Sequence, residues 1–187
     1  MTNPLLQKWS TPFEMPPFEL IHAAHFSEAF NQALAIHQAE IQNIANQKQA
    51  PSFQNTLLAL EASGELLNQT SAIFFNLSAS HTSPEIQAIE REISPKLAAH
   101  SAAMFLNAAL FERIDKLHAE RASLGLDSES IRLIERYHLD FVRAGARLKD
   151  KDRQAFAEYS EKLASCFTQF SQNVLADEAA FCLVLTE

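Results

Sequence analysis

The chain has 187 residues and a formal net charge of −8; 47% of its residues are hydrophobic and only 20% are charged, which excludes a disordered chain. The acidic balance argues against a nucleic-acid-binding protein, because contacts to a phosphate backbone need a basic surface. There are only three glycines, whereas sandwiches, barrels and Rossmann sheets use many at turns and bulges, so a mostly helical domain is predicted.

Residues 1–26 contain four of the seven prolines and the single tryptophan, Trp9. Proline lacks an amide donor and biases the preceding residue toward extended backbone, so this density predicts an extended arm and not a long helix. We expect the apolar side chains of this arm to lie on the helices that follow: Trp9, Phe13, Phe18 and Leu20.

Region 27–180 is predicted to be an all-α domain of about six amphipathic helices, because apolar residues recur there at steps of three and four. The sixth helix is expected from about Asp152 to Ala176. Pro95 predicts a kink or a break in the third helix, and Gly125 is placed to end the fourth in the left-handed conformation. Residues able to cap a helix N-terminus stand where the patterns begin: Ser27, Ser52, Ser83, Asn107 and Asp127.

Each of these helices is expected to bury one apolar stripe. The second stripe runs from Leu57 to Ser78 through Gly64, which predicts one helix there. The fifth contains Ile134 and Phe141. The sixth helix is expected to bury Phe156, Tyr159, Leu163, Phe167, Phe170 and Val174.

The last segment, residues 181–187, has a different pattern. Phe181–Leu185 form a short apolar run of the kind found in strands. A lone strand is not stable in water, so we interpret it as the start of a truncated strand whose partners lie in further sequence. The predicted organisation is therefore an arm (1–26), a helical domain (27–180) and the start of a strand (181–187).

Candidate metal ligands occur, but not in a strong pattern. Glu-x-x-His occurs twice, at Glu19–His22 and Glu135–His138, and di-iron helical bundles present two such pairs on facing helices. His22 and His25 could hold a zinc ion, but no third ligand stands nearby. There is no His-Glu-x-x-His and no Cys-x-x-Cys, so the strong zinc motifs are absent. We expect no metal or cofactor in this chain.

Nucleophilic catalysis is not indicated either, because there is no Gly-x-Ser-x-Gly and too few glycines for a phosphate loop. Cys166 is expected to be a packed thiol on the inner side of the sixth helix, and Cys182 is interpreted in the same way. We therefore expect no catalytic or cofactor-binding residue. The two cysteines, with no signal-peptide pattern and no apolar run of roughly 18 residues, suggest a cytoplasmic location and no membrane span.

A basic cluster lies between residues 132 and 153. Four arginines there fall at spacings of four, seven and four, which predicts one helix face: Arg132, Arg136, Arg143 and Arg147. This face is either solvated, or a surface for another acidic domain or for the carboxylate end of a ligand.

Two long stretches resemble a known family. Residues 124–148 (LGLDSESIRLIERYHLDFVRAGARL) and 53–67 (FQNTLLALEASGELL) resemble the N-terminal region of bacterial peptidyl-dipeptidases of the thimet oligopeptidase family, as does 170–175 (FSQNVL). The opening, 3–6 (NPLL) with 12–18 (PFEMPPF), is more similar to the oligopeptidase A branch. The resemblance runs in order over essentially the whole chain and covers about the front quarter of such an enzyme.

This resemblance implies a nearly all-helical, two-lobed zinc peptidase that cleaves short unstructured peptides. The family's zinc is held by a His-Glu-x-x-His helix and a later glutamate, and neither is present here, so no site residue carries over. The resemblance implies a non-catalytic helical region that walls the substrate channel, with the remainder of its own polypeptide as partner. The alternative is a free-standing helical protein-interaction module. Self-association of the chain is also expected, through the terminal strand or the arginine face.

Overall fold

The structure is a computed structural model that describes residues 2–184, without the side chain of Asp150. Seven α-helices, four short 3-10 turns and one π-helical turn make up the described part, in which no strand occurs, so the predicted all-α fold is confirmed. The α-helices are α1 (Ala24–Ala45), α2 (Ala59–Glu61), α3 (Glu65–Ser80), α4 (Pro84–Phe105), α5 (Ala108–Glu120), α6 (Ser128–Arg143) and α7 (Asp150–Ala180).

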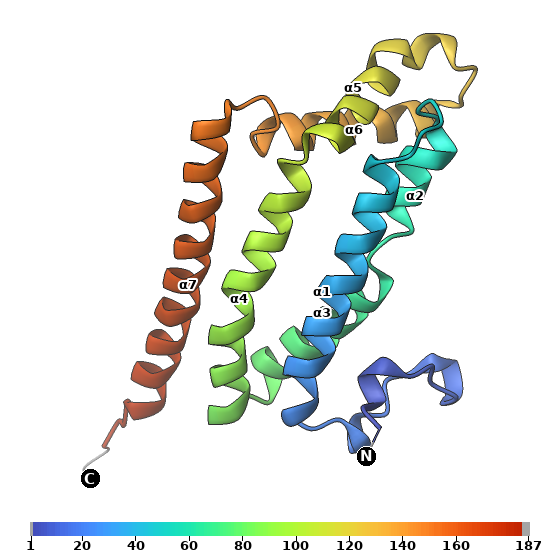
Figure 1. Ribbon diagram of the computed structural model, residues 1–187. Helices are drawn as coiled ribbons and strands as arrows, with labels where there is room; N and C mark the ends of the chain where they lie inside the picture. Colours follow the sequence, from blue (N-terminus) through green and yellow to red (C-terminus); the bar gives the residue numbers. More distant parts are fainter. Residues whose placement is uncertain (1, 185–187) are drawn as a thin grey trace.

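The helices form a layered bundle with a crossing pair at one end. Figure 1 shows α7, α4 and α1 side by side, with α3 against α1, and α5 and α6 lying across the upper end. The N-terminal arm lies beside the lower end of α1. The longest helix in the described part, α7, therefore lies at one edge of the molecule, where α4 is its main neighbour.

The bundle has a core of aromatic and aliphatic side chains. Between α1 and α3, the rings of Phe26 and Phe30 meet Phe74 edge to face, with centroids 5.0 and 5.5 Å apart. A second cluster joins α1 to the crossing pair α5 and α6, and in it Ile41 and Phe141 are fully buried. Burial of such side chains stabilises the fold by about 1.5–3 kcal/mol each.

Three α-helices and the π-helical turn begin where capping residues predict. The side chains of Ser83, Asn107 and Asp127 each accept a hydrogen bond from the backbone amide three residues on. Ser52 does the same and forms a reciprocal capping box with Asn55. Gly125 has φ 64°, as expected for a left-handed stop. Short-range capping chemistry is therefore enough to predict these starts.

The start at Ser27 is wrong, because α1 begins three residues earlier, at Ala24. Ser27 lies inside the helix and its hydroxyl donates to a carboxylate oxygen of Glu92, 3.0 Å away on α4. The helix does not break at Pro95, because α4 runs continuously from Pro84 to Phe105.

The second predicted helix is divided. A π-helical turn (Phe53–Leu58) leads into α2, and α3 starts only after Gly64, whose φ of 74° breaks the helix. A β-carbon at Gly64 would come within 3.0 Å of the His37 ring. A glycine is needed here both for the left-handed backbone and for the close approach of α1.

One buried arginine holds the connection between α1 and the π-helical turn. The guanidinium of Arg113 on α5 donates to the backbone carbonyls of Gln47 and Gln49, at 3.2 and 3.1 Å, and to the side-chain oxygen of Asn55, at 2.8 Å. Arg113 is 6% exposed. These bonds replace the backbone pairing that the irregular segment cannot make itself.

The arm packs differently from the prediction. Trp9 is half-buried against the α1–α3 cluster, as expected, and its indole N–H donates to the carbonyl of Pro4 at 2.8 Å. The side chain that anchors the arm is Leu5, which is 1% exposed. Phe13, Phe18 and Leu20 are exposed, so the expectation that they lie on the helices is wrong.

The sixth predicted helix, α7, forms but does not bury its stripe. All six apolar residues of the stripe are exposed, so their expected burial is wrong; they are Phe156 (38%), Tyr159 (65%), Leu163 (54%), Phe167 (66%), Phe170 (66%) and Val174 (41%). The buried residues of α7 are polar: Thr168 and Gln172 face α4. Gln172 accepts from Arg91 and donates to the carbonyl of Gln87 and to a carboxylate oxygen of Glu90, both at 3.0 Å.

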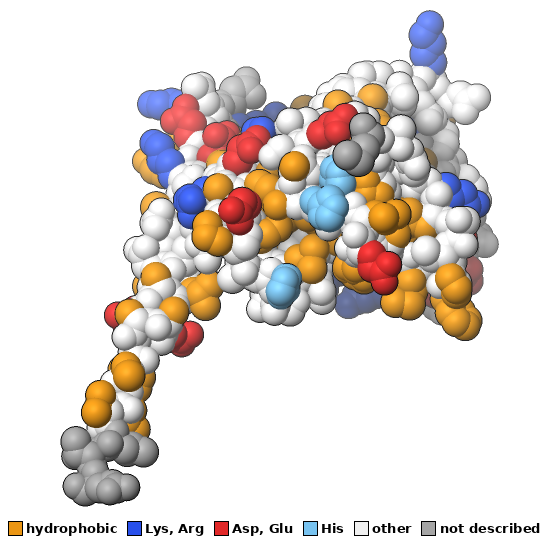
Figure 2. Space-filling view, turned by 90° about the horizontal axis from the view of Figure 1, so that it is seen from below, with side chains coloured by type: hydrophobic (Ala, Val, Ile, Leu, Met, Phe, Trp, Pro, Cys, Tyr) orange, Lys and Arg blue, Asp and Glu red, His pale blue; other side chains and the backbone are white. Residues whose placement is uncertain are grey.

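Phe181–Val184, the described part of the expected terminal strand, have no secondary structure, and their large apolar side chains are exposed. Pairing of this segment with strands in further sequence stays a prediction. Residues 185–187 lie outside the described residues. In the view of Figure 2, hydrophobic side chains line the end of the chain that protrudes at lower left.

Candidate functional site

The two Glu-x-x-His pairs do not come together. Glu19 and His22 lie in the arm, at the end of the molecule opposite α6, which carries Glu135 and His138. The backbone N–H of His22 donates to Nδ1 of His25 at 3.1 Å, which uses one ring nitrogen of this candidate zinc pair. The described residues include no group of three potential ligands that could hold a metal ion.

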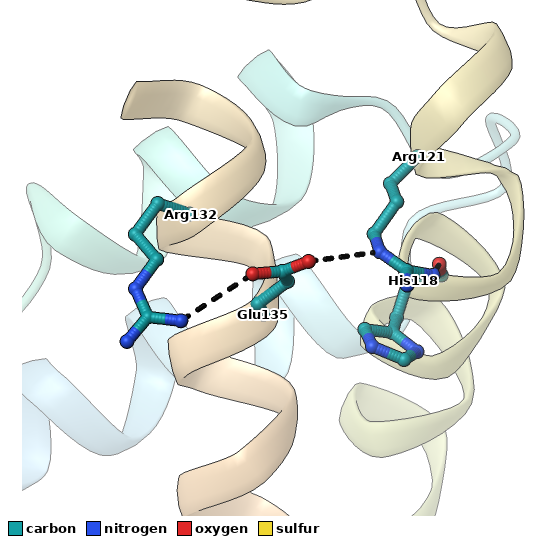
Figure 3. A network of polar contacts seen from close by, with 4 residues as sticks. All are labelled: His118, Arg121, Arg132 and Glu135. Carbon is teal, nitrogen blue, oxygen red and sulfur yellow. Dashed lines mark hydrogen bonds and ion pairs between the residues drawn. The ribbon is translucent and has the colours of Figure 1, made fainter. Parts of the chain in front are cut away.

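Glu135 is an ion-pair partner in the fold and not a free ligand. Its carboxylate oxygens lie 3.3 Å from Nε of Arg121 and 3.4 Å from Nη1 of Arg132, as Figure 3 shows. Arg121 also donates to the backbone carbonyl of His118 on α5, and its ion pair with Glu135 ties the end of α5 to α6. This arrangement fixes two helices to each other and leaves no carboxylate directed at a shared centre.

His138 also has other contacts. Its Nε2 lies 2.9 Å from a carboxylate oxygen of Asp115, and its ring stacks on His118 with centroids 3.8 Å apart. Burial is the largest influence that lowers the pKa of His118, followed by the nearby His138 and Arg121. Parallel stacked rings do not direct their nitrogens at one point, so this pair does not form a metal site.

A second histidine pair joins α1 and α4. Nε2 of His100 lies 2.9 Å from Nδ1 of His37, whose other nitrogen lies 3.3 Å from the Ser63 hydroxyl. Burial lowers the pKa of both rings, and for His100 the neighbouring His37 lowers it further. The two histidines are 63 residues apart, so no local spacing could have indicated the pair.

The arginine face is exposed, but it is not one helix face. Arg143 is the last residue of α6, and Arg147 lies in the turn that follows. Arg136 pairs with Asp140 at 3.0 Å, and Arg147 with Asp115 at 3.5 Å. Arg132 pairs with Glu135, so three of the four arginines are in surface ion pairs, which favours the solvated interpretation.

Arg132 and Arg136 also border a groove of about 550 Å³ between the π-helical turn and α6. Its apolar lining comes from Phe53, Leu58 and Leu133. The groove therefore combines an apolar lining with a cationic rim.

Neither cysteine is packed. Cys166 and Cys182 are both free and exposed, so the expected buried thiols are wrong. No helix in the described part is long and apolar enough to cross a membrane.

Known proteins with similar sequences are peptidases. No protein-family profile matches the chain. It is 41% identical over 179 residues to dipeptidyl carboxypeptidase of Salmonella typhimurium, which covers 96% of this chain and 26% of that protein. Identity to dipeptidyl carboxypeptidase of Escherichia coli is 40% over 185 residues, 99% of this chain and 27% of that protein. Identity to oligopeptidase A of Escherichia coli is 24% over 187 residues, 100% of this chain and 27% of that protein.

The chain is therefore homologous to peptidases, and the resemblance to the thimet oligopeptidase family is confirmed. Dipeptidyl carboxypeptidases are more similar to it than the oligopeptidases A are. The chain spans about a quarter of the length of the curated relatives it matches.

Proposed function

We propose that this chain is a non-catalytic helical region of a zinc-dependent peptidyl-dipeptidase or oligopeptidase, that it walls the substrate channel, and that it restricts access to short unstructured peptides. The observation that carries the proposal is the similarity to peptidases over 96–100% of the chain. The chain spans about a quarter of the length of those peptidases. The proposed location is the cytoplasm.

The candidate ligands of this chain do not fit a zinc site. Glu135 is held by Arg121 and Arg132, His138 by Asp115 and the His118 ring, and Glu19 and His22 lie far from them. Zinc hydrolysis needs a metal-bound water and a general base. We therefore assign the metal and the chemistry to other parts of the polypeptide, and exclusion of bulky substrates to this one.

The proposed partner is the remainder of the chain's own polypeptide. Its contact surface includes the bare apolar side chains of the arm and of α7, because contiguous exposed apolar area marks interaction sites. Phe13 is 97% exposed and Phe170 is 66% exposed. If the rest of the polypeptide contacted neither the arm nor α7, both apolar surfaces would stay exposed to solvent.

The test is a deletion and add-back experiment on the longer polypeptide. The part that follows this chain is expressed alone and with residues 1–187 in trans, and each sample is assayed on a short peptide and on a folded protein. We expect deletion to relax size selectivity or abolish activity, and add-back to restore cleavage of the short peptide only. Full activity with unchanged selectivity in the deleted form would show that this region is not a channel wall.

The isolated chain is expected neither to hydrolyse peptides nor to bind zinc or iron. Elemental analysis after dialysis checks both metals, and the iron measurement tests Glu19, His22, Glu135 and His138 directly. Stoichiometric metal would contradict this part of the proposal.

The alternative, a free-standing helical interaction module, is favoured by one observation, the groove bordered by Arg132 and Arg136. Its apolar lining and cationic rim suit a peptide segment with an apolar side chain next to a carboxylate. The deletion experiment separates the two functions, because an interaction module would leave peptidase selectivity unchanged.

A further inference from the structure

Three polar side chains connect α4, α1 and the turn between α2 and α3. Nε2 of His100 on α4 lies 2.9 Å from Nδ1 of His37 on α1, and Nε2 of His37 lies 3.3 Å from Oγ of Ser63 in the turn. Because α1 also packs on α3, and α4 on α7, these residues join the two pairs of helices that form the layered bundle. We call the three side chains the Ser63–His37–His100 relay.

The hydroxyl of Ser63 fixes the direction of the relay. It donates its proton to the backbone carbonyl of Leu60, which is 2.6 Å away and therefore much closer than the His37 nitrogen at 3.3 Å. A hydroxyl has only one proton to donate, but its oxygen can also accept. Toward His37 the Ser63 oxygen is thus the acceptor, and Nε2 of His37 carries the proton.

The proton positions on both histidine rings follow from this direction. A neutral imidazole carries one N–H, so Nδ1 of neutral His37 has no proton and can only accept. Its partner, Nε2 of His100, must then be the donor. Both neutral rings are therefore Nε2–H tautomers, and the hydrogen bonds all point from α4 toward the turn at Ser63.

The relay tolerates an added proton on one ring but not on the other. A proton added to Nδ1 of His100 leaves the Nε2–H donor of that ring in place. A proton added to Nδ1 of His37 places two donors 2.9 Å apart, so the hydrogen bond between α4 and α1 is lost. The ring centroids are 4.9 Å apart, and two charged rings at that separation also repel each other.

The surroundings of His37 favour its neutral form. On α1 its charged neighbour is Glu40, whose carboxylate accepts from the backbone N–H of Gly64 at 2.8 Å. On α4 its titratable neighbour is His100, and from the turn it is contacted by Ser63 and Gly64. Burial lowers the pKa of His37 more than Glu40 raises it, and burial together with His37 lowers the pKa of His100. The rings therefore accept protons only in acid.

We propose that the Ser63–His37–His100 relay is a pH-sensitive switch that fixes α4 to α1. At neutral pH both rings are neutral and the hydrogen bonds hold the two helices together. In acid, His100 takes the first proton and the contact is kept, whereas protonation of His37 breaks it and loosens the bundle between α1 and α4. The switch does not depend on the peptidase proposal, because its three residues lie in the described part of this chain.

Nitrogen-15 NMR of the histidine side chains tests the direction of the relay. In the full chain at about pH 7.5 we expect His37 and His100 to be neutral Nε2–H tautomers. A proton on Nδ1 of neutral His37 would overturn the proposal.

Two substitutions of His100 separate a donor from an acceptor at this position. His100→Gln keeps an N–H that can donate to Nδ1 of His37, so the tautomer of His37 should not change. His100→Glu offers only an acceptor, so neutral His37 should move its proton to Nδ1, and its pKa should rise above the ordinary value of about 6.5. Circular dichroism checks that both variants are folded. If His37 keeps its Nε2–H tautomer in folded His100→Glu, the proposed direction is wrong.

Hydrogen exchange tests the opening of the contact and does not need the glutamate variant. Lowering the pH from about 7.5 to about 5 should reduce the protection of the α4 amides around His100 at least tenfold more than that of the α3 amides around Phe74. In His37→Gln, which cannot take up this proton, the extra loss should disappear. The matched control, His81→Gln at an exposed position, should keep it. An extra loss as large in His37→Gln as in the wild type, or none in the wild type, would overturn the switch.

Discussion

Helices α6 and α7 carry the same kind of apolar pattern and end up in opposite environments. In α6, Ile134 and Phe141 are fully buried, because α5 and the π-helical turn lie over its apolar face. In α7, Phe167 and Phe170 are each 66% exposed, and the helix meets α4 through Thr168 and Gln172 instead. The period of a pattern predicts a helix and a face to be covered, but it does not predict which part of the molecule covers that face.

Truncating one phenylalanine in each helix gives the largest expected contrast. Phe141→Ala should lower the free energy of unfolding by about 3–5 kcal/mol, because it removes a ring from a packed core. Phe167→Ala should change it by less than about 0.5 kcal/mol. Urea melts at low protein concentration measure both without a contribution from self-association. Arg143→Ala, on the exposed side of α6, is the control; equal costs for the two phenylalanines would remove the contrast.

The polar contact that Gln172 makes between α7 and α4 is expected to have an intermediate effect on the free energy of unfolding. Gln172→Ala should cost about 1–3 kcal/mol, because it leaves the groups it bonds on α4, Arg91 among them, without that partner in a half-buried contact. Gln169→Ala removes a glutamine from the exposed side of the same helix and should cost within about 0.5 kcal/mol. If both substitutions cost the same, then this contact does not hold α7 in place.

The smallest effect concerns pH. Burial lowers the pKa of His37 and His100 in the folded chain, while Glu40 opposes the shift at His37. The unfolded chain therefore binds protons first, starting near the ordinary pKa of about 6.5, so the stability is fully present above that pH and is lost as the pH falls below it. The pKa of His118 is lowered too and adds to the same loss.

This is checked by urea melts at about pH 7.5 and about pH 5.5. His100→Gln should reduce the loss of unfolding free energy between the two conditions. The exposed His81→Gln should leave the loss unchanged. A loss as large in His100→Gln as in the wild type would mean that the α1–α4 pair does not contribute to it.

Local chemistry explains what could be predicted from the sequence. The caps at Ser83, Asn107 and Asp127 depend on residues within one turn, and the left-handed stop at Gly125 on a single residue. Ser27 has the right chemistry for a cap but lies inside α1, where its hydroxyl donates to Glu92 on α4 instead.

Contacts between distant residues could not be predicted in the same way. His37 and His100 meet only because α1 and α4 pack together, and Gln172 is buried only because α7 turns a polar face to α4. The candidate metal pairs failed for the same reason: Glu135 and His138 have the expected spacing, but Arg121 and Asp115, brought in by α5, satisfy them instead. Spacing predicts which side chains share a face and not what lies opposite.

The buried Arg113 has a consequence for how the chain tolerates changes in length. One rigid guanidinium binds two carbonyls that are two residues apart, at Gln47 and Gln49, and also Asn55 beyond them. Adding or deleting a single residue in this connection moves the chain by about 3.5 Å and breaks the three-point contact. Around Gly125, by contrast, an added β-carbon would meet no atom within 4 Å. Insertions such as an epitope tag therefore belong near Gly125, and the connection from 46 to 52 has a fixed length.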